Sequence, residues 1–334
     1  MTAAGAAPAG VGEARVPAPT RTPGWLAGAA DATEVALFTP LAWPVALAGF
    51  LARGGLAVFV LPIVVLPTVT GLATALGPVI ILLALAGTSP AVVPLAAATG
   101  LAFLAWWVGG SLIGGAADVV LVRWFGASLG RRLGRPGDAA PGRGPWSLVW
   151  RAMVVRWVAH LLLVPALTWA VVRVVAAVYR ELTAPGDVAV PLVFRVVSAV
   201  PEALLLLAVA WLVGEAVGAL AVRWLVLGGR SVAGSLGAAV RSLVRAPFGA
   251  VATAVLATGG SILLVAPPLV LSAWAWDAAR RAVLGELGPG VILAPVALVV
   301  VWCAALVLAG IASTWRSALW TAEMLRVHPV SGDR

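Results

Sequence analysis

Six long apolar stretches constrain this chain more than any other feature of its sequence. An α-helix rises about 1.5 Å per residue, so about 20 predominantly apolar residues are needed to cross the hydrocarbon core of a bilayer. The stretches that meet this length are residues 55–76, 95–122, 154–178, 203–224, 248–272 and 290–313. The sequence therefore predicts an all-α fold, a polytopic transmembrane bundle of six spanning helices surrounded by lipid.

The composition excludes several other classes of protein. Hydrophobic residues make up 62% of the 334 residues and charged residues 10%, whereas soluble domains are about 25% charged. A soluble enzyme, a disordered protein and a disulfide-stabilised scaffold are therefore excluded. All 22 basic residues are arginines and the net charge is +9. Because arginines in the loops of a membrane protein fix its orientation, no nucleic-acid partner is expected.

The segments that precede the first stretch need separate interpretation. Residues 1–24 are rich in Ala, Pro and Gly and are predicted to be a disordered tail. A transmembrane domain is expected over residues 25–327, followed by a short tail over residues 328–334. Residues 35–52 carry no charged residue but contain two prolines. We expect an interfacial or re-entrant helix there, and a seventh span is the alternative.

The distribution of arginines predicts the orientation of the bundle. With six spans and both termini on one side, that side collects 17 arginines and the opposite side four. Loops rich in arginine remain in the cytoplasm, so both termini are expected to be cytoplasmic. We therefore expect a multi-pass protein of the bacterial cytoplasmic (inner) membrane.

Similar sequences recur at the ends of the second, fourth and sixth spans. They read GGAADVVLVRW at 114–124, GEAVGALAVRW at 214–224 and GIASTWRSALW at 310–320. RGGLAVFVLP at 53–62 also resembles RWVAHLLLVP at 156–165, with Arg and Pro nine positions apart in both. These matches suggest three repeated helical hairpins, although a chain so rich in Ala, Val and Leu also produces such matches by chance.

Two pairs of glycines lie four positions apart within the predicted spans. The pairs are Gly110 with Gly114 and Gly214 with Gly218. Small residues at this spacing share one helix face and let a neighbouring backbone approach closely. We expect helix packing within the bundle, and the alternative is a face for association with a second copy or a partner protein.

Three ionisable residues, Asp118, His160 and Glu215, fall inside predicted spans. Such groups are costly in a membrane and are candidates for function. Counted from the arginines at the span ends, all three lie about 6–12 Å inside the cytoplasmic boundary. Together they would form an intramembrane polar site that carries protons or binds a cation. The alternative is that each group is satisfied singly by a neighbouring helix or an arginine.

Arg173 and Glu202 lie near the opposite boundary, in consecutive spans. Arg173 is about 25 Å along its helix from Arg156, and Glu202 begins the fourth span. We expect an ion pair that clamps the two helices, with a substrate site as the alternative.

The cytoplasmic loops contain two arginine-rich segments. Residues 231–245 form an amphipathic pattern with Arg241 and Arg245 at helical spacing, and Arg131, Arg132 and Arg135 cluster in another loop. Both segments are suited to anionic lipid headgroups, although retention of the loops in the cytoplasm explains the same charges.

The chain lacks the motifs that carry common chemistry. It has no P-loop, no HExxH, no GxSxG and no CxxC, and Cys303 is its one cysteine. These absences exclude the corresponding nucleotide, zinc and acyl-transfer sites. The chain is therefore not expected to be an enzyme, and no cofactor or metal is expected.

The arrangement resembles a group of bacterial six-helix membrane proteins that includes the membrane domain fused to some glycerophosphodiester phosphodiesterases. The resemblance is carried by the Arg-Gly-Gly and proline-rich start at 53–67, the glycine-to-arginine exits at 114–123 and 214–223, and GGRSVAGSLGAAVRSLVRAP at 228–247. It covers about residues 35–327 and implies a six-helix membrane domain. The phosphodiesterase domain is lacking here, so that activity is not implied.

Two functions remain for such a chain. The polar residues and the helices broken by Pro and Gly favour a transporter or a lipid-handling permease. A non-catalytic scaffold or partner subunit of a membrane complex is the alternative, favoured by the glycine faces.

Overall fold

The computed structural model describes residues 24–60, 92–132, 144–184, 190, 192–284 and 290–327, and these contain helices but no strand. The helices are α1 (Trp25–Leu37), α2 (Ala42–Phe50), η1 (Leu51–Gly55), α3 (Leu56–Val60), α5 (Val92–Arg132), α6 (Pro145–Ala159), α7 (Leu163–Thr183), α8 (Leu192–Ser198), α9 (Pro201–Val226), α10 (Val232–Arg245), α11 (Pro247–Leu284) and α12 (Gly290–Val327). Six segments within them are long and apolar enough to span a membrane: Ala42–Val60, Val93–Arg132, Leu163–Thr183, Pro201–Val226, Pro247–Ala282 and Ile292–Val327. The predicted all-α membrane bundle with six spanning helices is confirmed.

The first of these segments begins earlier than the sequence predicts. Ala42–Val60 joins the end of the expected interfacial helix at 35–52 to the start of the expected span at 55–76. The helix is broken at the junction, where Gly54 has a φ of 103°, a conformation that favours glycine because it lacks a Cβ. Residues 61–76 lie outside the described residues, so the extent of the first span stays a prediction.

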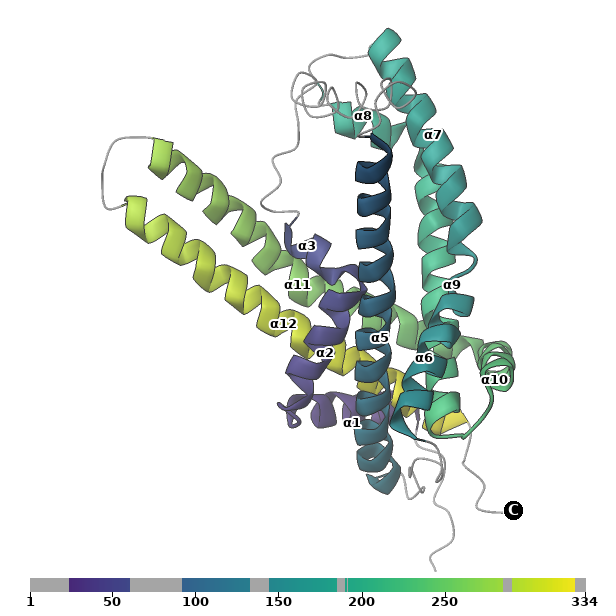
Figure 1. Cartoon of the computed structure of the whole chain (residues 1–334). Coiled ribbons are helices and arrows are strands. Elements are labelled where there is room, and N and C mark those ends of the chain that lie inside the picture. The colour runs from purple at the N-terminus through teal and green to yellow at the C-terminus, as the bar shows by residue number, and fades with distance from the viewer. Residues whose placement is uncertain are drawn as a thin grey trace, which may run out of the picture.

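The long helices diverge from one end of the molecule (Figure 1). α5, α7 and α9 run upright, whereas α11 and α12 form a pair that leans away from them. α1, α6 and α10 lie at the end where the two groups meet, which we call the basal end, and α8 lies at the opposite end. The basal end is therefore where most of the contacts between distant parts of the chain are concentrated.

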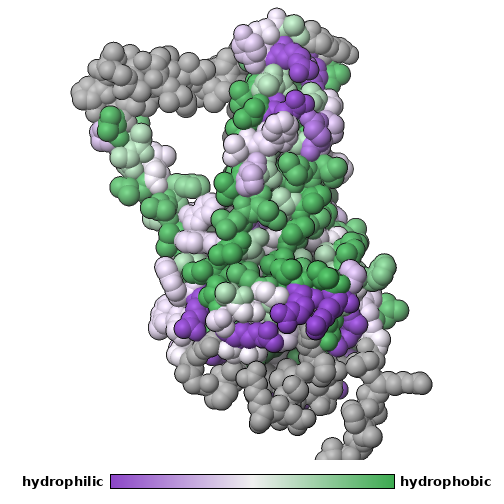
Figure 2. Space-filling view, turned by 90° about the vertical axis from the view of Figure 1, so that its right-hand side faces the viewer, coloured by the Kyte–Doolittle hydropathy of each residue, from purple (hydrophilic) through white to green (hydrophobic). Residues whose placement is uncertain are grey.

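The packed core lies at the basal end. Its largest fully buried side chains include Phe125 and Leu129 of α5, Leu225 of α9, and Trp320 and Leu325 of α12. Towards the opposite end the helices carry large apolar side chains on their exposed surface, such as Val172 at 57%, Leu205 at 66% and Leu263 at 74% exposure. Figure 2 shows this apolar surface on one face, between hydrophilic bands near the two ends. The surface suits contact with lipid hydrocarbon rather than water.

α1 and α10 pack across the basal end as short helices. α1 is attached by hydrogen bonds from the indole of Trp25 to Thr253 Oγ1 (3.0 Å) and from the indole of Trp315 to Thr33 Oγ1 (2.8 Å). α10 occupies the range predicted for an amphipathic helix and is capped by Ser231, whose Oγ accepts from Gly234 N. Its buried face carries small residues, Ser235, Ala238, Ala239 and Ser242, whereas Val240 and Val244 are exposed.

Acidification is expected to release α1 from α5. Arg132 donates hydrogen bonds to both oxygens of Glu34 (2.8 and 2.9 Å), and Asp31 lies 3.8 Å from the same guanidinium. The hydrogen bond from Arg132 lowers the pKa of Glu34 below its ordinary value. The stabilisation is therefore complete at neutral pH and is lost as the pH falls through this lowered pKa.

Hydrogen–deuterium exchange of the α1 amides, corrected for intrinsic rates, measures this release. Exchange should accelerate on acidification in the wild-type chain, whereas Glu34→Gln should show the faster exchange at every pH. Equal protection of α1 in both proteins across the pH range would contradict the prediction.

Candidate functional site: a buried arginine–carboxylate network

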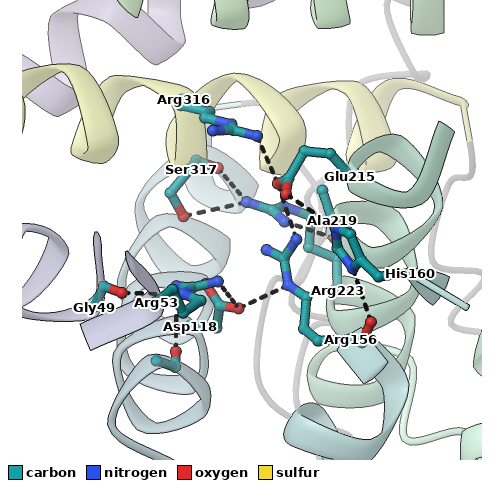
Figure 3. A network of polar contacts seen from close by, with 11 residues as sticks. Gly49, Arg53, Asp118, Arg156, His160, Glu215, Ala219, Arg223, Arg316 and Ser317 are labelled. Carbon is teal, nitrogen blue, oxygen red and sulfur yellow. Dashed lines mark hydrogen bonds and ion pairs between the residues drawn. The ribbon is translucent and has the colours of Figure 1, made fainter. Parts of the chain in front are cut away.

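A chain of alternating charges connects five elements near the basal end (Figure 3). Arg53 of η1, Asp118 of α5, Arg156 of α6, Glu215 of α9 and Arg316 of α12 follow one another in space, each within 3.0 Å of the next. Three of these four contacts are charge-assisted hydrogen bonds, which are short and strong, and the contact of Arg316 with Glu215 is an ion pair. The network therefore joins segments that lie as far apart as residues 53 and 316 in the chain.

Asp118 is the more fully enclosed of the two carboxylates, with 7% of the residue exposed. Arg53 donates to both of its oxygens, from Nη2 to Oδ1 and from Nη1 to Oδ2, each at 3.0 Å. Arg156 donates a third hydrogen bond from Nε to Oδ2 at 3.0 Å. Burial of a carboxylate is tolerated when hydrogen bonds and opposite charges compensate the loss of water, and Asp118 has both.

Glu215 receives the other branch of Arg156. Arg156 Nη1 donates to Glu215 Oε1 at 2.9 Å, and Arg316 Nη2 lies 2.8 Å from the same oxygen. The Arg316 side chain also lies against the ring of Trp211, 5.6 Å from its centroid. Arg156 is thus shared between two carboxylates, and Arg316 is the contact through which α12 joins the network.

His160 lies beside this network, in the turn between α6 and α7. Its Nδ1 is 2.8 Å from the carbonyl oxygen of Arg156, and its Nε2 is 3.8 Å from Glu215 Oε2. A carbonyl oxygen only accepts hydrogen bonds, so Nδ1 carries the proton in this contact. The three ionisable residues singled out in the sequence, Asp118, His160 and Glu215, therefore lie together, linked through Arg156.

Arg223 adds a fourth guanidinium, which forms no ion pair with a carboxylate in the part of the chain that the structure describes. It is 3% exposed. Its hydrogen bonds go to neutral acceptors: the hydroxyls of Thr321 (3.0 Å) and Ser317 (3.1 Å) and the carbonyls of Ser317 (2.7 Å) and Ala219 (2.6 Å). Among the described residues the site therefore holds four guanidinium groups and two carboxylates. The surplus of positive charge is costly in a medium of low dielectric constant.

The paired glycines make room for the arginines of the network. A Cβ on Gly114 would approach Arg53 Nε to 2.6 Å, and a Cβ on Gly218 would approach Arg156 Cδ to 3.2 Å. The other member of each pair meets backbone: Gly110 faces the carbonyl of Ala52, and a Cβ on Gly214 would lie 3.0 Å from the carbonyl oxygen of Ala159. Both glycine faces are thus occupied by residues of the same chain.

The network also follows the sequence matches between hairpins. Arg53 and Arg156, which occupy matching positions in the two aligned segments, each contact a carboxylate on the second long helix of their own hairpin, Asp118 and Glu215 respectively. The helix that carries each arginine is interrupted at or shortly after it, by η1 and by the turn at His160. α11, at the start of the third hairpin, is continuous over 38 residues. Descent of the three hairpins from one unit stays a prediction.

Arg173 and Glu202 lie apart from the network, towards the opposite end. Arg173 Nε donates to Glu202 Oε1 at 2.9 Å, and the two side chains are 39% and 50% exposed. The pair connects α7 to α9, and its exposure offers no enclosed site for a ligand. This arrangement suits a clamp between two helices.

Sequence reasoning missed the arginines as members of the site. Arg53, Arg156, Arg223 and Arg316 were interpreted as markers of the membrane boundary, and the depths of His160 and Glu215 were counted from Arg156 and Arg223. The structure instead places Arg53, Arg156 and Arg316 in contact with the carboxylates and Arg223 on neutral acceptors of α9 and α12. For Arg53 and Arg156 the available signal was their matching position in the two aligned segments, 53–62 and 156–165.

The chemistry of the network favours an anion over a cation as its ligand. Both oxygens of Asp118 accept hydrogen bonds from guanidinium groups, and Glu215 contacts two guanidinium groups through Oε1, so the positive charges outnumber the negative ones. No group of three or more His, Cys, Asp or Glu side chains that could hold a metal occurs within the described ranges. Comparisons with family models, curated proteins and solved structures find no match, so the resemblance noted in the sequence stays a prediction.

Replacement of the central arginine tests the network. Arg156→Gln leaves two buried carboxylates with fewer cations, and breaking a buried ion pair costs about 3–5 kcal/mol. The mutant is expected to unfold at a markedly lower temperature in detergent micelles than the wild type. Arg241→Gln removes the same charge from the exposed face of α10 and should change stability by less than about 0.5 kcal/mol. Equal effects of the two substitutions would refute the assigned role of Arg156.

Adjacent glycines test the close approach of α5 to η1. Gly110→Ala places a methyl group against the Ala52 carbonyl, whereas Gly109 has nothing within 4 Å of its Cβ position. Overpacking costs about 1–3 kcal/mol, but Gly→Ala at an open helical position is favourable by about 0.5–1 kcal/mol. The unfolding temperature is expected to fall in Gly110→Ala and to rise slightly in Gly109→Ala. Shifts of the same sign would argue against the packing described.

Proposed function

We propose that the protein is a lipid-handling, permease-like protein of the bacterial cytoplasmic membrane that acts on anionic lipids. The observation that carries the proposal is the surplus of guanidinium groups in the network, four against two carboxylates. Guanidinium groups bind phosphate oxygens in the same bidentate way as carboxylate oxygens. The negative charge of a lipid phosphate brought to this site would offset part of this surplus.

The orientation supports uptake from the cytoplasmic leaflet. Arg123, Arg131 and Arg132 at the end of α5, and Arg241 and Arg245 on α10, lie towards the basal end. Because arginine-rich loops stay in the cytoplasm, we assign the basal end and both termini to that side. The network then lies near the leaflet in which anionic headgroups attract arginine.

The position of α12 provides a way to admit a phosphate. α12 joins the network through Arg316, which contacts Glu215, and through Ser317 and Thr321, which accept hydrogen bonds from Arg223. Above this contact α12 and α11 lean away from α5, α7 and α9 (Figure 1). Replacement of the Glu215 carboxylate by a lipid phosphate at Arg316 leaves the charge around that guanidinium unchanged, so the exchange has a low electrostatic cost.

Reconstitution into vesicles tests lipid movement. The purified chain is placed in phosphatidylcholine vesicles with a fluorescent phosphatidylglycerol, and translocation is followed by chemical quenching of the outer leaflet. Wild-type protein should accelerate translocation, and Arg316→Gln should slow it by about tenfold, the equivalent of about 1.4 kcal/mol. Arg316→Lys keeps the charge and should be slowed less.

The control is Arg281→Gln, which removes an exposed arginine from the far end of α11, where 75% of its side chain is exposed. This variant should translocate lipid at the wild-type rate. Wild-type vesicles that match protein-free vesicles would overturn the proposal, as would equal loss of activity in Arg316→Gln and Arg281→Gln. Intact folding of each variant is established by its unfolding temperature.

A scaffold or partner subunit of a membrane complex is the second candidate. It is favoured by the exposed apolar surface of the leaning helix pair, which includes Val255 and Leu263 of α11 and Leu293 and Val299 of α12, all at least 59% exposed. Crosslinking from cysteines placed at Leu263 and Leu293 in native membranes distinguishes the two. Specific capture of one protein supports the scaffold function, whereas capture of lipid alone contradicts it.

A further inference from the structure

A second basic site lies outside the network, at the basal end of α5. A recess of about 360 Å³ opens between this end of α5 and the turn that joins α1 to α2. Its lining includes Thr39 and Leu41 from the turn and Arg123, Trp124, Ser128 and Arg131 from α5. It shares no residue with the buried network, so its ligand is a separate question.

The two arginines of the recess have unused donors. Within the described parts of the chain neither Arg123 nor Arg131 forms an ion pair, and the buried Nε of Arg123 has no hydrogen-bond partner. Arg132, the next residue, is by contrast held by Glu34 and Asp31. An enclosed donor without an acceptor costs free energy, so the Arg123 guanidinium is not fixed by a partner in the way that Arg132 is.

The hydroxyl groups of the recess can accept hydrogen bonds, whereas its arginines can only donate them. Thr39 Oγ1 donates its proton to the carbonyl of Val35 (2.7 Å), and Ser128 Oγ donates to the carbonyl of Trp124 (2.9 Å). Each hydroxyl oxygen therefore retains lone pairs that accept hydrogen bonds. The recess offers cationic donors for an anion and neutral acceptors for hydroxyl groups.

Apolar side chains flank the recess. Phe38 is 80% exposed, Leu41 is 76% exposed, and Trp124 is 39% exposed. Tryptophan is favoured at the level of lipid headgroups, and large aliphatic and aromatic side chains beside it suit the upper part of the acyl chains. The ligand that matches both halves of this surface is itself amphipathic.

We propose that this recess binds the headgroup of an anionic phospholipid whose phosphodiester carries a hydroxylated group, as in phosphatidylglycerol. Arg123 and Arg131 contact the phosphate. Because the two residues lie about 12 Å apart along α5, their side chains approach the phosphate from different heights on the helix. Thr39 and Ser128 accept hydrogen bonds from the headgroup hydroxyls. The proposal does not depend on lipid translocation, because a scaffold in the same membrane would bind the lipid equally well.

Lipid binding to the full chain tests the site. The protein is placed in nanodiscs of phosphatidylcholine with a graded content of phosphatidylglycerol, and retained lipid is counted by native mass spectrometry. The double variant Arg123→Gln/Arg131→Gln should retain about tenfold less phosphatidylglycerol than the wild type. The matched control Arg280→Gln/Arg281→Gln removes the same charge from the far end of α11, where the two side chains are 44% and 75% exposed, and should retain phosphatidylglycerol. The proposal would be overturned if both variants lost phosphatidylglycerol equally. It would also be overturned if the wild type retained phosphatidylcholine as well as it retains phosphatidylglycerol.

Two further arms define the ligand. Thr39→Val/Ser128→Ala should weaken the binding of phosphatidylglycerol. The binding of phosphatidic acid should be unchanged, because this lipid has no headgroup hydroxyl beyond the phosphate. Equal weakening of the binding of both lipids would contradict the role of the hydroxyls. Glycerol 3-phosphate should not displace the lipid at concentrations well above that of the lipid, because it lacks acyl chains. Displacement by this soluble compound would assign the recess to a free phosphate ester and overturn the lipid proposal. A normal translocation rate in the Arg123→Gln/Arg131→Gln variant would leave the two proposals independent.

Discussion

The arrangement of helices at the basal end depends on charges that have left water, in which each carboxylate is neutralised by guanidinium groups from other helices. Arg53, Asp118, Arg156, Glu215 and Arg316 alternate in sign, so each interior member has an opposite charge on both sides. In a medium of low dielectric constant such contacts are strong, and an unbalanced member is costly. Because these residues come from η1, α5, α6, α9 and α12, the balance of charge holds only when these five elements are in the observed places.

Close approach of the backbones is what allows this balance. The glycines at 114 and 218 leave space in which the arginine stems of residues 53 and 156 lie flat against a neighbouring helix. A side chain at either glycine would push the guanidinium away from its carboxylate. Packing and electrostatics are therefore coupled at the same positions, and the glycine pairs have a role more specific than general helix association.

Much of this architecture was accessible from the sequence because it depends on local composition. The apolar stretches predicted the long helices, and the pattern at 231–245 predicted α10. The sequence placed a boundary between residues 35–52 and the next span, and the structure has a break in the helix there, at Arg53 and Gly54. The apolar segment Ala42–Val60 nevertheless runs through this break. Asp118, His160 and Glu215 were found because charges in apolar stretches are rare. Their arginine partners were not, because an arginine at the end of a span also has a topological explanation.

The sequence by itself determined that the chain is an all-α membrane protein, since hydropathy is a sum over neighbouring residues and the bilayer sets the required length. Only the tertiary structure decided which arginines neutralise carboxylates and which form no ion pair among the described residues. Arg132 and Arg131 are adjacent, yet one is paired with Glu34 and the other lines the recess. The difference arises from helix geometry: successive side chains on α5 point about 100° apart, and only one of them faces the carboxylates of α1.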